Sequence, residues 1–254
     1  MIFTNLITTN LRTKELGKDI EYYQRLESTN LESWELINDN IATHGMIVIT
    51  DNQTNGKGRN GNTWFMSPSK GLTMSLILIK QMKIKDAALI PLAAGVAMAK
   101  TLKNRGVKPE LKWPNDILIE GKKCGGILCE TRVASELVSK MVLGLGLNVN
   151  ETENDFPEEI RDRVSSIYIN TGFSNQRELI CAIFTTYFEQ LLNDLTSTNR
   201  FWNEYCSHIE KEVSFNFNQK NHTGIFKGVN DQGKAIIDIN GEIKKFTSIE
   251  LIDF

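Results

Sequence analysis

The chain has 254 residues and a formal charge of −2, with 29 lysine and arginine residues against 31 aspartate and glutamate residues. Hydrophobic residues make up 41% and charged residues 24% of the sequence, which are ordinary globular proportions and exclude collagen-like and disordered classes. The near-neutral charge also argues against a dedicated nucleic-acid-binding protein, which is usually basic overall or along one stripe.

The cysteines and the N-terminus indicate the compartment. The four cysteines form no Cys-x-x-Cys pair and the three histidines lie far along the sequence from Cys124 and Cys129, so we expect no zinc site. Free thiols suit a reducing compartment. The first residues show no basic region followed by an apolar stretch, and the uncharged run over 87–99 is too short to span a bilayer. We therefore expect a soluble, cytoplasmic protein that does not associate with membranes.

The hydrophobic pattern predicts an α+β chain. Residues 1–18 are polar and weakly patterned and predict a short N-terminal arm. In chain order, the patterns then predict a strand over 20–26, a helix over 31–39 capped by Ser28-Thr29-Asn30, strands over 45–50 and 71–79, a helix over 86–105, strands over 110–113, 116–120, 124–132 and 140–148, and a helix over 177–195. Strands dominate the middle of the chain and helices flank them, which predicts a sheet covered on one face.

The C-terminal part changes character near residues 207–213. Short strands are expected over 224–229, 235–239 and 242–246, and Asn240-Gly241 is a strong signal for a two-residue hairpin turn because both turn positions need positive φ. About forty residues of short strands fit a small antiparallel barrel.

The first segment that carries chemistry is residues 53–64. It contains a Gly-x-Gly-x-x-Gly pattern over 56–61 after a strand. A dinucleotide fold would need a helix next and an acidic residue about 20 positions on, whereas a proline and a strand follow here. No Gly-Lys-Ser/Thr phosphate loop occurs. Two readings remain open: a plain surface turn, or a flexible loop that folds over an anion with Lys57, Arg59 and its free backbone N–H groups.

Two further segments are weaker signals when each is taken alone. Lys112-Trp113-Pro114-Asn115-Asp116, followed by residues 121–127, fits a hairpin with solvated lysines at its tip, where Gly125-Gly126 would allow close approach to the backbone. Residues 142–150 are apolar with alternating glycines, which weaken a strand unless a ligand or backbone packs on that face. Taken alone, this segment fits a tightly packed core strand.

Together and in this order, the three segments resemble the biotin protein ligases. The motifs that carry the resemblance are Ser28-Thr29-Asn30, Gly-Arg-x-Gly-x-x-Trp over 58–64, Lys-Trp-Pro-Asn-Asp over 112–116 with the lysine-rich hairpin over 122–127, and Gly-x-Gly-x-Asn over 144–148. The resemblance implies a short arm over 1–18, a class II synthetase-like catalytic domain over 19–208 with a mixed, mainly antiparallel sheet and flanking helices, and a small SH3-like β-barrel over 209–254.

The resemblance also implies a reaction and the residues that serve it. Biotin and ATP would react to biotinyl-5′-AMP, and biotin would then pass to a lysine of the biotin carboxyl carrier protein of acetyl-CoA carboxylase. Arg59 and Lys123 would be catalytic, with Mg²⁺ on the phosphates. The implied biotin-binding residues are Ser28, Thr29, Asn30, Gln53, Gly56, Lys57, Gly58, Arg59, Lys123, Gly125 and Gly126, and the implied ATP-binding residues are Lys57, Arg59, Trp64, Lys123 and Asn148.

Two departures from the family pattern bear on these expectations. Lys57, Asn60 and Asn62 stand where the family often has further basic residues, and lysine cannot bind an anion in the bidentate manner of arginine. The winged-helix segment of the family's repressor members has no counterpart in residues 1–18, so we expect no specific DNA binding. The alternatives are a lipoate ligase-like adenylating enzyme and a non-catalytic biotin-responsive regulator. The resemblance also suggests a homodimer.

Overall fold

The computed structural model describes residues 1–218 and 220–253, and its centre is an eight-stranded mixed sheet. The strand order is β1 (Ile20–Tyr23), β2 (Ile47–Thr50), β5 (Leu72–Leu78), β10 (Leu137–Leu147), β9 (Lys122–Ala134), β8 (Asp116–Ile119) and β7 (Pro109–Lys112), with β6 (Met82–Lys83) beside β10. Only the β1–β2 pairing among these strands is parallel, which confirms the mixed, mainly antiparallel sheet.

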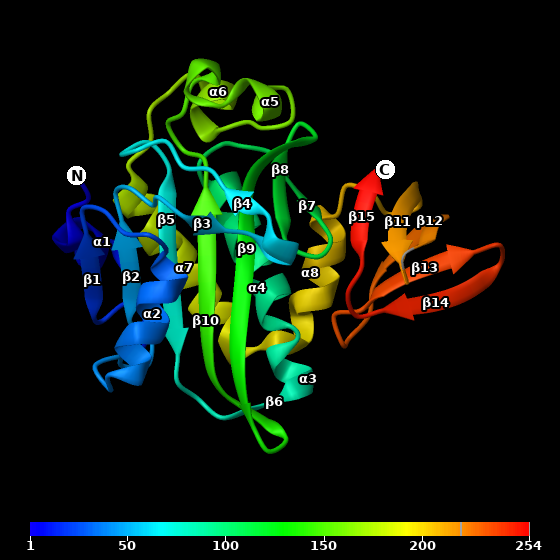
Figure 1. The fold of residues 1–254 in the computed structure, drawn as a ribbon, viewed down its shortest axis with the longest axis horizontal. Coiled ribbons are helices and arrows are strands. Elements are labelled where there is room, and N and C mark those ends of the chain that lie inside the picture. Colours follow the sequence, from blue (N-terminus) through cyan, green and yellow to red (C-terminus); the bar gives the residue numbers. More distant parts are fainter. Residues whose placement is uncertain (219, 254) are drawn as a thin grey trace.

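Helices cover both faces of this sheet, although the sequence predicted one covered face. The first face carries α4 (Ile90–Asn104), α7 (Arg177–Asn193) and α8 (Thr198–Tyr205) (Figure 1). On the second face, α2 (Thr29–Asn38) lies over β2, β5 and β10. The prediction of one covered face was therefore wrong, because Leu36 and Ile37 of α2 form a second apolar cluster with Val48, Ile77 and Val142.

The helix expected over 86–105 is two helices in the structure. A short helix α3 (Ile84–Ala87) precedes α4, which begins at Ile90 with a proline in its first turn. Proline is tolerated there because its missing N–H would have no partner inside the helix. The small helices α5 (Glu158–Arg161) and α6 (Ile167–Thr171) lie together at one end of the sheet (Figure 1).

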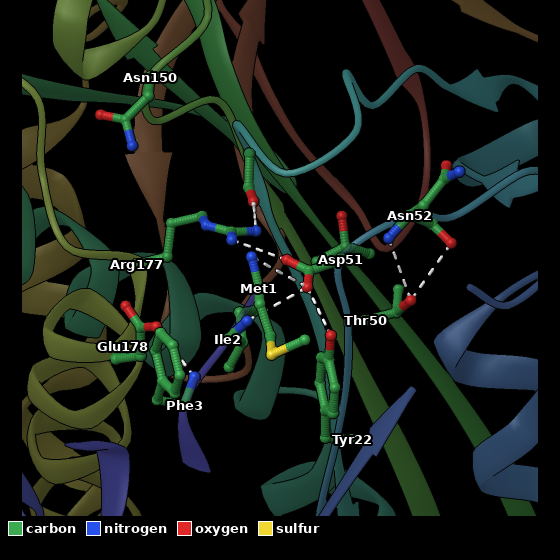
Figure 2. Close-up of polar contacts among 12 residues, drawn as sticks. Met1, Ile2, Phe3, Tyr22, Thr50, Asp51, Asn52, Asn150, Arg177 and Glu178 are labelled. Carbon is green, nitrogen blue, oxygen red and sulfur yellow. Dashed lines mark hydrogen bonds and ion pairs between the residues drawn. The ribbon is translucent and has the colours of Figure 1, made fainter. Parts of the chain in front are cut away.

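The N-terminal segment is built into the core. It contains a helix, α1 (Thr4–Asn10), that packs on α7, and Ile2, Ile7, Leu11 and Leu16 are buried in the main apolar cluster. Its backbone also reaches a buried polar centre at the end of β2, where Asp51 accepts hydrogen bonds from Ile2 N–H (3.2 Å), Tyr22 Oη (2.6 Å) and Arg177 Nη2 (2.7 Å) (Figure 2). These contacts fix the point where the chain leaves β2 toward Gln53.

The C-terminal part is a five-stranded antiparallel sheet. Its order is β14 (Glu242–Phe246), β13 (Ala235–Ile239), β12 (Lys220–Val229), β11 (Glu212–Phe217) and β15 (Glu250–Asp253). Asn240 and Gly241 have φ of 55° and 86°, which confirms the predicted hairpin turn. The main apolar cluster continues into this sheet, because Trp202 of α8 contacts the ring of Phe226. Within the described residues, no helix is long and apolar enough to cross a membrane.

Candidate functional site

A cleft opens on the sheet face that carries α2. Its walls come from segments far apart in the sequence: the start of α2, the hairpin of β3 (Gly56–Lys57) and β4 (Thr63–Trp64), the turn after β7, and the C-terminal sheet through Leu251. The hairpin crosses the strands β9 and β10 (Figure 1). The cleft is lined by Ser28, Thr29, Asn30, Gln53, Lys57, Gly58, Arg59, Asn60, Asn62, Thr63, Trp64, Thr73, Lys112, Trp113, Pro114, Asn115, Asp116, Lys123, Gly126, Ile127, Leu128, Gly144, Leu145, Gly146 and Leu251.

The glycine-rich segment forms the outer wall of the cleft. Between β3 and β4 the chain makes a single turn over Arg59–Gly61, with Asn60 and Gly61 at φ of 55° and 79°. Arg59 Nη1 lies 3.4 Å from Asn115 Oδ1, and its Nη2 donates to Ser248 Oγ at 3.1 Å. One guanidinium therefore joins the glycine-rich hairpin, the turn after β7 and the C-terminal sheet.

The glycines of β9 and β10 form the floor of the cleft. A Cβ at Gly144 would lie 2.3 Å from Asn30 Oδ1, and a Cβ at Gly146 would lie 2.3 Å from the indole of Trp64. A larger residue does not fit at either position. The space next to Gly144 is taken by Asn30 of α2, and the space next to Gly146 is taken by Trp64 of the hairpin. Gly126, in register with Gly146, faces Lys123 and Trp64 at a looser distance, because a Cβ there would lie 3.6 Å from Lys123 Cε and 3.8 Å from the Trp64 ring.

Lys123 lies in the cleft beside a carboxylate. Its Nζ is 2.7 Å from Asp116 Oδ1, and both side chains are partly exposed. Asn115 holds the adjacent turn, because its Nδ2 donates to the carbonyl oxygen of Ile127 at 2.8 Å. Trp113, which is buried, donates from Nε1 to the carbonyl oxygen of Gly233 at 3.2 Å and so ties this turn to the C-terminal sheet.

The start of α2 provides a cluster of buried polar groups. The helix begins at Thr29, earlier than the predicted range of 31–39, and the Ser28 side chain makes no capping hydrogen bond. Instead Gln53 Oε1 accepts from the backbone N–H of Thr29 at 2.9 Å. The first helical amide is therefore satisfied by the residue that follows β2, which couples Gln53 to the helix terminus.

The structure brings most of the predicted site residues to one cleft, and three of them lie elsewhere. Gly56, in β3 of the hairpin, is buried between its partner Trp64 in β4 and the Gln53 side chain. Gly125 faces the opposite side of β9 from Gly126, because successive residues of a strand alternate between faces. Asn148 follows β10, and its Nδ2 donates to the carbonyl oxygen of Ser165 at 2.9 Å. Gly125 and Asn148 thus make their described contacts outside the cleft lining, and their roles toward biotin and ATP stay predictions.

Several cleft residues were not singled out from the sequence. Asn115 and Asp116 lie in the Lys-Trp-Pro-Asn-Asp motif, but no separate role was assigned to them. Thr73 of the cleft lining, and the buried Ser75 that hydrogen-bonds Asn30 behind it, could have been found, since they are polar at every second position of an otherwise apolar strand, which marks one face of that strand. The contribution of Leu251 and Ser248 has no such local signal, because it depends on how the C-terminal sheet packs.

The cleft is suited to two bound anions rather than to nucleophilic catalysis. Cationic side chains of Lys57, Arg59, Lys112 and Lys123 lie around it. Burial raises the pKa of the Cys124, Cys129 and Cys181 thiols, and it raises the pKa of Cys206 to about 12, so these cysteines are protonated at neutral pH. In the part of the chain that the structure describes, no group of three or more His, Cys, Asp or Glu side chains is arranged to hold a metal ion.

Comparisons with known proteins agree with this geometry. Residues 22–148 match the model of the biotin/lipoate A/B protein ligase family. The chain is 32% identical over 251 residues to the bifunctional ligase/repressor BirA of Bacillus subtilis, covering 96% of this chain and 77% of that protein. It is 24% identical over 237 residues to the biotin–[acetyl-CoA-carboxylase] ligase of Mycobacterium tuberculosis, covering 88% of this chain and 85% of that protein.

A solved structure gives the same result. The biotin protein ligase from Aquifex aeolicus in complex with biotin and ATP aligns with a TM-score of 0.79 at 26% identity, covering 93% of this chain and 100% of that one. The alignment includes both the catalytic sheet and the C-terminal sheet, since it extends over nearly the whole chain.

Proposed function

Because the chain belongs to the biotin/lipoate A/B protein ligase family, we propose that it activates biotin with ATP to biotinyl-5′-AMP and transfers biotin to a lysine of a biotin carboxyl carrier domain. The observation that carries this proposal is one cleft that combines hydrogen-bonding groups at the start of α2 with the cations of the hairpin and of β9. A polar heterocycle and two anionic groups can bind there together.

The first step joins two anions, so its main requirement is positive charge. A carboxylate oxygen of biotin attacks the α-phosphorus of ATP, the bond to the leaving phosphate oxygen breaks, and pyrophosphate departs. Arg59 can contact both carboxylate and phosphate through its fork of N–H donors. Lys123, held toward the cleft by Asp116, offsets the charge that develops on the reacting oxygens.

Magnesium fits the same wall. Mg²⁺ in nucleotide sites is bound by one or two carboxylates together with phosphate oxygens, and Asp116 provides a carboxylate on the cleft beside Asn115. Asp116 would hold the ion with the ATP phosphates, and the ion would supply further neutralisation of phosphate charge.

The second step needs exclusion of water and access for an amine. The neutral amine of an acceptor lysine attacks the acyl carbon of biotinyl-5′-AMP, an amide bond forms, AMP leaves and one proton is lost to solvent. Arg59 and Trp64 belong to the hairpin wall, which can close over the adenylate and limit hydrolysis. The preferred acceptor is the biotin carboxyl carrier protein of acetyl-CoA carboxylase, as the name of the Mycobacterium tuberculosis relative suggests.

Acceptor labelling tests the whole reaction. The chain is incubated with biotin, ATP and Mg²⁺ and a purified biotin carboxyl carrier domain, and the acceptor mass is measured. We expect one biotin per acceptor on its target lysine and none on a variant with arginine at that lysine. No ATP-dependent labelling of the native acceptor would contradict the proposal. The homodimer, the cytoplasmic location and the lack of specific DNA binding remain predictions from the sequence.

A further inference from the structure

Glu130, which is half-buried, lies at the outer end of a chain of hydrogen bonds that becomes fully buried as it leads to the cleft. It is on β9, on the same face as Gly126 and Leu128, and its Oε2 accepts from Asn30 Nδ2 at 2.8 Å and from Trp34 Nε1 at 3.2 Å. Both donors belong to α2. Glu130 does not line the cleft but lines a neighbouring hollow beside residues 55–63, whereas its partner Asn30 lines the cleft itself.

The other links of the chain follow from Asn30. Its Oδ1 is 2.7 Å from Ser75 Oγ, and Ser75 Oγ is 2.7 Å from Thr29 Oγ1. Ser75 is fully buried, and Thr29 and Asn30 are nearly so. Gly144 makes room for the Asn30 amide, as described above. The order is therefore Glu130, Asn30, Ser75, Thr29 and then the cleft.

The carboxylate gives this chain a direction. An ionised carboxylate only accepts hydrogen bonds, so Asn30 must present its NH₂ group to Glu130 and its carbonyl oxygen to Ser75. A carbonyl oxygen also only accepts, so the single hydroxyl hydrogen of Ser75 points at Asn30. Ser75 can then only accept from Thr29, whose hydroxyl hydrogen points at Ser75.

Thr29 is left as an acceptor at the cleft. Its contact with Ser75 is 2.7 Å, whereas its contact with Gln53 Oε1 is 3.4 Å, and that oxygen already accepts from the Thr29 backbone N–H. The lone pairs of Thr29 Oγ1 are then available to a ligand N–H. A cyclic urea presents such N–H groups, and a dithiolane ring presents none.

We propose that Glu130 is a specificity-determining residue: it polarises the chain through Asn30 and Ser75 so that Thr29 accepts a hydrogen bond from the ureido N–H of the substrate. This inference rests on the proposed function and names which ring chemistry the pocket selects. Without Glu130, the Asn30 amide can turn over, the hydroxyl hydrogens can reverse, and Thr29 can become a donor that no longer accepts from a ureido N–H.

The test measures the selectivity for the N–H group. The KM for biotin, the KM for its two ureido N-methyl derivatives and the KM for ATP are determined by pyrophosphate exchange in the parent and in Glu130→Ala. We expect a biotin KM at least about tenfold higher, an unchanged ATP KM, and a smaller KM ratio of N-methylbiotin to biotin for the contacted nitrogen. A variant that merely loosens the fold would raise the KM of both ligands together and leave the ratio unchanged.

Three further variants distinguish an effect of the hydrogen-bond chain on selectivity from a general loss of stability. Ser75→Ala cuts the chain at another link and is expected to lower the same ratio, with no additional loss in the double variant with Glu130→Ala. Trp34→Phe removes the other donor to Glu130, and Glu32→Ala removes a carboxylate of α2 that bonds Tyr23 instead; both should keep the parental ratio within about twofold.

The outcomes distinguish this inference from its premise. An unchanged ratio in both Glu130→Ala and Ser75→Ala, in a parent that is active with biotin, overturns the role of Glu130 and leaves the ligase proposal standing. A parent chain that shows no biotin-dependent exchange overturns the ligase proposal and the inference with it.

Discussion

Gly144 and Gly146 offer a matched pair of substitutions on one strand. Both face the cleft from β10, and alanine at either position places a Cβ 2.3 Å from a neighbouring side-chain atom, well inside an ordinary van der Waals contact. The neighbours differ, since Gly144 contacts Asn30 at the start of α2, where the biotin ring is proposed to bind, and Gly146 contacts Trp64 of the hairpin. We therefore expect the two variants to damage different substrates.

The magnitude follows from what each neighbour must give up. Asn30 cannot move away from a Gly144→Ala methyl without losing its hydrogen bonds to Glu130 and Ser75, each worth about 1 kcal/mol. Biotin binding must restore this arrangement, so the cost of about 2 kcal/mol enters the binding free energy and corresponds to about a 30-fold higher biotin KM. Trp64 is on the hairpin and half-buried, so Gly146→Ala displaces the ring and raises mainly the ATP KM, by about tenfold for an overpacking cost near 1.4 kcal/mol.

Pyrophosphate exchange measures both KM values in each variant, and thermal unfolding shows whether the two alanines cost similar stability. Each variant is the control for the other, because strand, sheet face and substitution are the same, although Gly144 is buried and Gly146 is half-buried. Equal effects of both variants on both KM values, or an unaltered biotin KM in Gly144→Ala, would contradict the expectation that Gly144 supports biotin binding and Gly146 supports ATP binding.

Other substitutions test the charges of the cleft and of the core. Lys123→Ala should slow adenylate formation about 10²–10³-fold in single turnover, as for other groups that stabilise developing charge. Arg59→Gly should still form adenylate but release it faster. A Lys123→Ala variant in which only the rate of adenylate release changes would refute this assignment. Residues 55–62 should exchange amide hydrogens more slowly once biotin and a non-hydrolysable nucleotide are bound, and equal exchange would refute closure. Burial alone would raise the pKa of Asp51, but its hydrogen bonds from Tyr22 and Arg177 and the Arg177 charge outweigh burial and lower it, so its stabilisation is present above the ordinary carboxyl pKa and is lost as pH falls. Asp51→Asn should lower the free energy of unfolding in urea by about 3–5 kcal/mol at pH 7 and by less in acid. A loss below about 1 kcal/mol at pH 7 would refute the stabilising role of Asp51. Burial raises the pKa of Glu151 to about 7, so its ionisation destabilises the fold as pH rises through that value. Glu151→Gln should be up to about 3 kcal/mol more stable than the parent at pH 8 and no more stable at pH 4, and a gain that does not depend on pH would count against this.

The sequence was most informative where periodicity is strong. The central strands and the helices α4 and α7 occur where the apolar pattern predicted them, and the Asn240-Gly241 turn has the expected positive φ values. The N-terminal segment was misjudged as a plain arm, because four buried apolar residues spaced over 2–16 show no clear period. The strands β11 and β15 and the helix α8 were also not predicted, and they are held by packing of the C-terminal sheet on the catalytic part.

For the site, motif residues could be predicted and their supports could not. Ser28, Gln53, Arg59 and Lys123 lie in one cleft as expected. Gly125 and Asn148 do not line it. Gly125 faces the other side of β9 because of the strand pleat, and Asn148 follows the end of β10; a sequence motif shows neither effect. The role of Glu130 depends on contacts across 100 residues of sequence with Asn30, and no local pattern marks such a contact.

The central claim is that this cleft activates biotin, and acceptor-free exchange of labelled pyrophosphate into ATP tests it most directly. The purified chain is assayed with Mg²⁺ and ATP, with biotin or with lipoate, and with neither. The account predicts exchange that depends on biotin, does not occur with lipoate, and is strongly reduced in Lys123→Ala. Exchange that requires lipoate, or no exchange with either acid, would contradict it.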